Sequence, residues 1–84
     1  MYEVDTSDVN EQVADLPPSA RDAFDELITV LSLTPWNGEP AAHANPEGSV
    51  RFFPIHSASG DGFVYYLILE DEARVDVLTL IWVG

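Results

Sequence analysis

Residues 62–83 read GFVYYLILEDEARVDVLTLIWV and contain the strongest secondary-structure pattern of the chain. Two runs of β-branched and aromatic residues flank a short polar break, Glu70 to Arg74. This pattern is typical of a β-hairpin. In the first run, alternation places Tyr65, Leu67 and Leu69 on one face and Val64, Tyr66 and Ile68 on the other.

The second run of the hairpin is also apolar on both faces. Strict alternation places Val75, Val77, Ile81 and Val83 opposite Leu78, Leu80 and Trp82. A strand that is apolar on both faces is usually covered on both. The rest of this short chain can supply one cover, and what lies on the second face is left open by the sequence.

Two helices are predicted before the hairpin. Val9, Val13 and Leu16 have the i, i+4, i+7 spacing of one helical face, and Pro17-Pro18 ends this helix and begins the next. The second helix has an apolar stripe made of Ala20, Ala23, Phe24, Leu27, Ile28 and Leu31, and Pro35 stops it. We expect capping boxes at Asp8 with Glu11 and at Ser19 with Asp22.

The remaining segments complete the predicted architecture. Tyr2–Val4 forms a short first strand, and Thr34–Gly48 is a loop anchored by Trp36, because three prolines and two glycines exclude regular structure there. Val50–Ile55 is a strand that Pro54 places at a sheet edge or ends early. The order is a strand, two helices and a three-stranded antiparallel meander. We therefore predict one two-layer α+β domain over residues 1–84.

Charge is the most unusual property of the composition. Fifteen Asp and Glu stand against three Arg and no Lys, which gives a formal net charge of −12. Such a chain repels nucleic acid and anionic membranes, so its field favours a basic partner, although the same charge also serves solubility. The absence of cysteine excludes disulfides, and no targeting or membrane-spanning pattern is present. We expect a cytoplasmic protein.

The order of elements resembles the RelE/ParE toxin superfamily, and in particular its RelE/YoeB-like members. The resemblance rests on Tyr2-Glu3-Val4, Leu16-Pro17-Pro18, Pro35-Trp36, Gly48–Phe52, Gly62–Ile68 and Arg74–Leu78. It implies a RelE-like fold, with the helices on one face of the sheet. It also implies ribosome-dependent mRNA cleavage by residues borne on the strands, and acidic antitoxin partners. Onto this sequence the resemblance carries Arg51 with Tyr65 or Tyr66 as catalytic candidates, but the basic residues of the family are missing.

Two functions follow from the resemblance and the charge. The first is a protein-binding module without ribonuclease activity, which forms a homodimer or binds an antitoxin-like protein. Its predicted interface is drawn from Phe52, Phe53, Tyr65, Tyr66, Leu78, Leu80 and Trp82. The alternative is an active toxin that cleaves mRNA with Arg51, Tyr65 and Tyr66. A weaker third reading is that the acidic surface imitates nucleic acid.

The sequence indicates no cofactor and no metal site. Its two histidines, His43 and His56, lie in separate loops, without the close spacing of metal ligands. Two features stay open at this point. One is which face of the strands is exposed, and the other is whether the long loop around Trp36 folds across that face.

Overall fold

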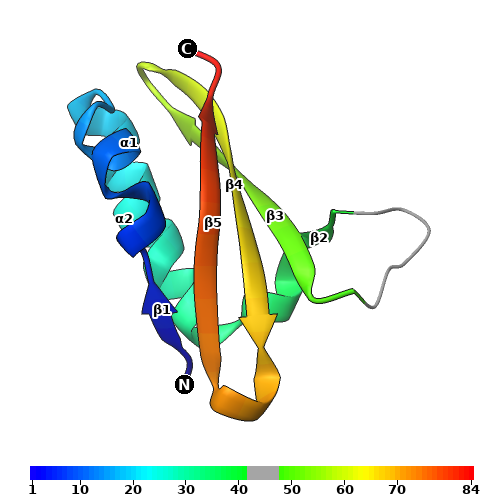
Figure 1. Cartoon of the computed structure of the whole chain (residues 1–84). Coiled ribbons are helices and arrows are strands. Elements are labelled where there is room, and N and C mark those ends of the chain that lie inside the picture. The colour runs from blue at the N-terminus through cyan, green and yellow to red at the C-terminus, as the bar shows by residue number, and fades with distance from the viewer. Residues whose placement is uncertain (42–47) are drawn as a thin grey trace.

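The computed structural model describes residues 1–41 and 48–84, and it has the predicted α+β architecture (Figure 1). The elements in chain order are β1 (Glu3–Asp5), η1 (Ser7–Val9), α1 (Asn10–Ala14), α2 (Pro18–Leu33), η2 (Pro35–Asn37), β2 (Glu39–Pro40), β3 (Val50–Ser57), β4 (Gly60–Leu69), η3 (Glu70–Glu72) and β5 (Arg74–Trp82). Both helices lie on one side of the sheet, so the molecule has two layers.

The sheet has five strands in the order β1-β5-β4-β3-β2. β3, β4 and β5 form the predicted antiparallel meander, with β4 at its centre. β1 pairs in parallel with β5, so the sheet is mixed. The parallel pair requires a crossover on one face of the sheet, and the chain provides it with α1 and α2.

A β-bulge in β5 changes which residues share a face. Tyr65 pairs with Thr79 and Tyr66 pairs with Val77, so Leu78 is an extra residue in its strand. The bulge reverses the alternation beyond it, and the strict parity predicted for the second run is therefore wrong. Val75 and Val77 share the helix-covered face with Leu80 and Trp82.

The core lies between that face and the helices. The helices contribute Val9, Leu16, Ala20, Phe24, Leu27 and Leu31, and the strands contribute Ile55, Val64, Tyr66, Ile68, Val75, Val77 and Leu80. The apolar stripe of α2 is thus buried as predicted, with Ala23 and Ile28 half-buried at its margins. Pro18 stands in the first turn of α2, where its missing N–H leaves no bond unmade.

Three local predictions are corrected by the structure. The segment predicted as an irregular loop contains η2 and the two-residue strand β2, which pairs with Arg51 and Phe52 of β3. Neither helix has a side-chain cap at its start, because Asp8 lies inside η1 and Ser19 follows Pro18 in the first turn of α2. The hydroxyl of Ser19 instead forms a 2.6 Å hydrogen bond with that of Ser59.

The sequence predicts no membrane-spanning segment. Within the described residues, no helix is long and apolar enough to cross a bilayer.

Candidate functional site

The two faces of the meander differ in what covers them. The inner face packs on α1 and α2, and no helix within residues 1–41 and 48–84 crosses the opposite face. We call this second face the outer face. It consists of Val50, Phe52, Phe63, Tyr65, Leu67, Leu78 and Ile81. Phe63 is 37% exposed and Ile81 is 47% exposed, although both lie in the middle strands of the sheet. The exposed face that the sequence left open is therefore the face that carries Tyr65.

Three aromatic rings form a cluster on the outer face. The centroids of Phe52 and Tyr65 lie 5.3 Å apart, and those of Phe52 and Phe63 lie 6.1 Å apart in an edge-to-face arrangement. The register explains the cluster, because Phe52 stands directly opposite Tyr65, and Phe63 is two residues along β4 on the same face. The result is an apolar surface built on rigid strands.

The three catalytic candidates do not share one face. Tyr65 is half-buried on the outer face, whereas Arg51 and Tyr66 belong to the inner face. The alternation of β3 and β4 makes this inevitable, since Arg51 pairs with Tyr66 and its neighbour Phe52 pairs with Tyr65. Whether any of them acts in catalysis stays a prediction.

Arg51 is 8% exposed and binds backbone carbonyls. Its Nη1 donates to the carbonyl oxygens of Gly38 at 2.8 Å and Trp36 at 3.2 Å, and its Nε donates to that of Gly48 at 3.2 Å. The guanidinium carbon also lies 4.9 Å from the ring centroid of Trp36, within the range of a cation–π contact. Arg51 thereby ties η2 and the start of β3 together.

Tyr66 is fully buried behind Arg51. Its hydroxyl donates a 2.6 Å hydrogen bond to the carbonyl oxygen of Pro35. Burial raises the pKa of Tyr66 to about 12, so its phenol stays protonated at neutral pH. In this structure the phenol of Tyr66 therefore holds η2 against β4 through its hydrogen bond to Pro35.

The predicted interface residues are divided between the two faces. Phe52, Tyr65 and Leu78 belong to the outer face, and Leu78 is 41% exposed because it is the bulge residue. Phe53, Tyr66, Leu80 and Trp82 belong to the inner face and pack in or against the core. The outer face also contains Val50, Phe63, Leu67 and Ile81, which are absent from the predicted set. The alternation of the first run could have indicated Phe63, whereas Ile81 depends on the bulge.

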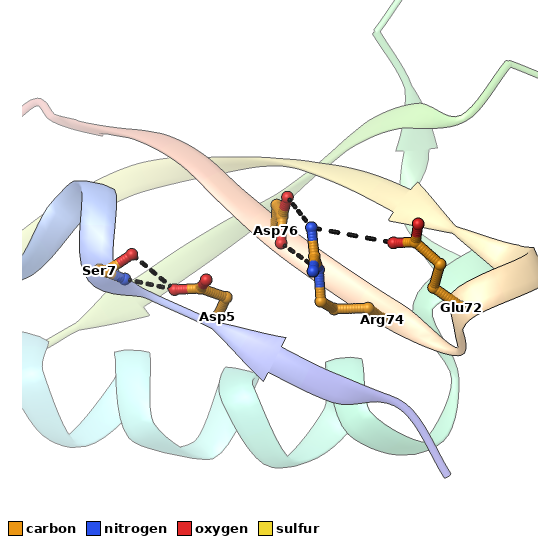
Figure 2. A network of polar contacts seen from close by, with 5 residues as sticks. All are labelled: Asp5, Ser7, Glu72, Arg74 and Asp76. Atoms are coloured by element: carbon orange, nitrogen blue, oxygen red, sulfur yellow. Dashed lines mark hydrogen bonds and ion pairs between the residues drawn. The ribbon is translucent and has the colours of Figure 1, made fainter.

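Carboxylates surround the only arginine on the outer side of β5 (Figure 2). Arg74 Nε donates to Asp76 Oδ1 at 2.9 Å, and Arg74 Nη2 lies 3.2 Å from Asp76 Oδ2 and 3.8 Å from Glu72 Oε2. Asp76 raises the pKa of Arg74. Asp5 stands opposite Asp76 in the parallel β1–β5 pair. It accepts hydrogen bonds from the hydroxyl of Ser7 and from the backbone N–H of Ser7, which lower the pKa of Asp5. Alternation along the strand already places Arg74 and Asp76 on one face, whereas the position of Asp5 opposite Asp76 depends on the parallel pairing.

A second polar network lies at the η3 end of the sheet. Glu70 accepts hydrogen bonds from the hydroxyl of Tyr2, at 2.6 Å to Oε2 and 2.9 Å to Oε1, and from Trp36 Nε1 at 2.9 Å to Oε2. The hydrogen bond from Tyr2, followed by that from Trp36, lowers the pKa of Glu70. An open cleft of about 360 Å3 beside this network is lined by Trp36, Ser49, Ile68, Leu69 and the three residues of η3. Trp36 is thus anchored at this end of the sheet.

The histidines give no metal site among the described residues. His56 Nδ1 lies 3.1 Å from Asp61 Oδ1 across the β3–β4 turn, where both side chains are exposed. No three His, Cys, Asp or Glu side chains in residues 1–41 and 48–84 stand close enough together to hold a metal ion. His43 lies outside the described residues.

Comparison with known proteins identifies the fold. No protein family and no curated sequence matches the chain. Among solved structures, the chain is similar to the isolated RelE toxin of E. coli, with a TM-score of 0.72 and 11% identity over 100% of this chain and 86% of that one. It is also similar to a chain of the intact E. coli RelBE toxin–antitoxin complex, with a TM-score of 0.73 and 11% identity over 100% of this chain and 99% of that one. The chain therefore has a RelE-like toxin fold, as the resemblance predicts.

Proposed function

We propose that this chain is a RelE-like toxin-fold protein without ribonuclease activity, and that it works as a protein-binding module with an antitoxin-like partner. We place it in the cytoplasm of a bacterium. The observation that carries the proposal is where its three arginines lie and which groups they bind. Arg51 is buried against backbone carbonyls, Arg74 is bound by Asp76 and Glu72, and Arg21 lies on α2, away from the outer face.

RNA cleavage through the 2′-hydroxyl needs a base, an acid and cations that stabilise the developing negative charge. The chain has no lysine, so its arginines are its only permanently charged cations. An outer face with one arginine that is already neutralised is poorly suited to bind a phosphate group. The net charge of −12 further opposes entry into ribosomal RNA.

The similarity to a chain of the RelBE complex supports an antitoxin-like partner rather than a homodimer. Two copies of this chain would bring together two surfaces that each belong to a molecule of charge −12. Like charges disfavour such self-association, whereas a partner with complementary charge gains affinity and association rate.

Expression in a bacterial host tests the absence of nuclease activity. We expect growth, translation and mRNA integrity to stay unchanged after induction, both for the wild type and for Tyr65→Phe. Cleavage of mRNA by purified protein added to translating ribosomes would refute the proposal if the fragments disappear with Tyr65→Phe. Tyr65→Phe is the suitable variant because Tyr65 is only half-buried, whereas a substitution of the fully buried Tyr66 would confound activity with folding.

Co-expression tests the partner. The chain and the product of the reading frame adjacent to its gene should elute together as an equimolar complex, and sedimentation of the chain alone should give a monomer. A stable homodimer of the chain alone, with no complex on co-expression, contradicts the proposed partner.

The alternative function is an active toxin that cleaves mRNA on the ribosome. One observation favours it. Tyr65 is flanked by Phe52 on the outer face, and exposed aromatic side chains on a sheet can stack on RNA bases. The ribosome experiment above distinguishes the two functions, because only the alternative predicts mRNA fragments that depend on Tyr65.

A further inference from the structure

We propose that the outer face docks a cationic amphipathic segment of another protein, whose apolar side chains cover the aromatic cluster and whose Lys or Arg side chains meet the carboxylates around Arg74. This inference rests on the proposed function, because it assigns the surface and the chemistry of the partner. The charge of the surface identifies the occupant.

The apolar half of the surface is fixed by the strand register. Phe63 and Ile81 stand opposite each other on adjacent strands, and Phe52 contacts Phe63 from the third strand. Aromatic side chains held by rigid strands are the usual hot spots of protein interfaces, because they lose little entropy when they are covered. Because this part of the face is apolar, the proposed partner must present an apolar side to it.

The acidic half adjoins it along β5 and β1. Asp76 lies five residues before Ile81 on β5, and Asp5 stands opposite Asp76 on β1. Asp76 and Glu72 contact the guanidinium of Arg74, and Asp5 stands opposite Asp76, so a cluster of three carboxylates and one guanidinium keeps a negative excess (Figure 2). The pairing with Asp76 and Glu72 occupies Arg74, and the field of the cluster attracts additional cations from outside.

The dimensions of the face suit one helix. Adjacent strands are about 4.8 Å apart, so the distance from β3 across β4 to β5 is roughly 10 Å. That width is close to the diameter of a single helix with its side chains, about 10–12 Å. A helix lying along the strands can therefore contact the aromatic cluster with one face and reach the carboxylates with a flanking cationic row.

Charge excludes the other occupants. A second copy would place its own acidic cluster and net charge of −12 against this surface, and RNA would add phosphates to it. A partner whose apolar side is flanked by cations brings neither an acidic cluster nor phosphate groups to this surface. Electrostatic complementarity also directs the encounter to the acidic end of the sheet.

Three synthetic peptides of about 18 residues, long enough to form a helix, test this inference with the intact chain. The first carries an apolar Leu face and a Lys face, the second replaces Leu with Ser, and the third replaces Lys with Glu. Backbone amide NMR shifts locate the binding, and a titration gives the dissociation constant. We expect the Leu/Lys peptide to shift the amides of Phe52, Phe63, Tyr65 and Ile81. The other two peptides should bind at least about tenfold more weakly.

Variants test the contributions of the apolar half and the acidic half of the surface to binding separately. Phe63→Ser with Ile81→Ser should weaken binding of the Leu/Lys peptide at least about tenfold. Val30→Ser is the matched control, because Val30 is an apolar residue of α2 with 40% exposure. Glu72→Gln should weaken binding and reduce its salt dependence, whereas Asp25→Asn on the solvent side of α2 should change neither.

Three results would overturn the inference. The first is equal binding of the Ser/Lys peptide, which would indicate attraction by charge alone. The second is a set of shifts on α2 instead of the outer face. The third is concentration-dependent shifts of Phe63 and Ile81 without any peptide, which would identify a second copy as the occupant. None of these results bears on ribonuclease activity, so the proposed lack of cleavage stands or falls with its own experiment.

Discussion

The hydroxyl of Tyr66 and the carbonyl of Pro35 form a 2.6 Å hydrogen bond that fastens η2, which follows α2, to the central strand β4. The two residues are 31 positions apart in the chain, and both side chains are fully buried. Without the phenol, the Pro35 carbonyl would be buried without this partner. The bond therefore explains why a strand residue of the core is tyrosine and not phenylalanine.

Tyr66→Phe should destabilise the fold. We expect a loss of about 1–2 kcal/mol, the cost of leaving a buried acceptor unpaired, measured by urea denaturation. Tyr65→Phe is the matched control in the next position, and it should change stability by less than about 0.5 kcal/mol because its hydroxyl faces outward. Equal effects of the two substitutions would contradict the assignment of the two tyrosines to opposite faces.

Gly38→Ala should also be costly, because a β-carbon at this position overlaps the Tyr66 hydroxyl and approaches the backbone oxygen of Phe52. We expect a destabilisation of about 1–3 kcal/mol. In a Tyr66→Phe background the cost should fall by about 1 kcal/mol, since the overlapping oxygen is removed. Additive effects in this double-mutant cycle would show that the hydroxyl is not the obstacle.

The sequence predicted the architecture well because apolar periodicity and proline placement are local signals. The stripe of α2 and the two runs of the closing hairpin have distinct periods, and Pro17-Pro18 and Pro35 mark the ends of the helices. The β2 strand was missed because its two residues carry no periodic pattern, and its pairing with β3 is a tertiary contact. The same holds for the bulge at Leu78, which depends on the partner strand.

The candidate site was less predictable for the same reason. A one-residue change of register moves a side chain to the other face, so the assignment of Leu80 and Trp82 depended on the bulge. The exposure of Tyr65 and the burial of Arg51 required knowledge of which face the helices cover. The position of Asp5 opposite Asp76 required the parallel pairing of β1, which no local pattern encodes.

Arg51→Lys should destabilise the chain although it keeps the charge. A lysine has one ammonium group and cannot donate from a rigid fork to the carbonyls of Gly38, Trp36 and Gly48 together. We expect a loss of about 1–3 kcal/mol in urea denaturation. Arg21→Lys, on the exposed side of α2, should stay within about 0.5 kcal/mol. An unchanged midpoint for Arg51→Lys would mean that these carbonyls do not need the guanidinium.

Stability should fall at alkaline pH because of Tyr66. Its pKa is raised from 10.0 to about 12 in the folded chain. The unfolded chain therefore loses this proton first, so the stabilisation is complete below pH 10.0 and is lost as the pH rises toward about 12. Tyr66→Phe should flatten the dependence of the unfolding free energy on pH over this window. An unchanged slope in Tyr66→Phe would show that Tyr66 is not the source of this pH dependence.

Glu70 should make the fold sensitive to acid. Its folded-state pKa lies below the ordinary value of 4.5, because the carboxylate accepts hydrogen bonds from Tyr2 and Trp36. A lowered carboxyl pKa means that the unfolded chain binds the proton more readily. The stabilisation is therefore present above pH 4.5 and is lost as the pH falls through the folded-state pKa.

Tyr2→Phe removes the hydrogen bond that contributes most to the lowered pKa of Glu70, and it should reduce the slope of unfolding free energy against pH below 4.5. Because the slope measures the difference in bound protons between the two states, it isolates this effect from a general loss of packing, which would shift stability equally at every pH. If Tyr2→Phe lowers stability by the same amount at neutral and acidic pH, Tyr2 contributes packing and not a hydrogen bond to the ionised carboxylate.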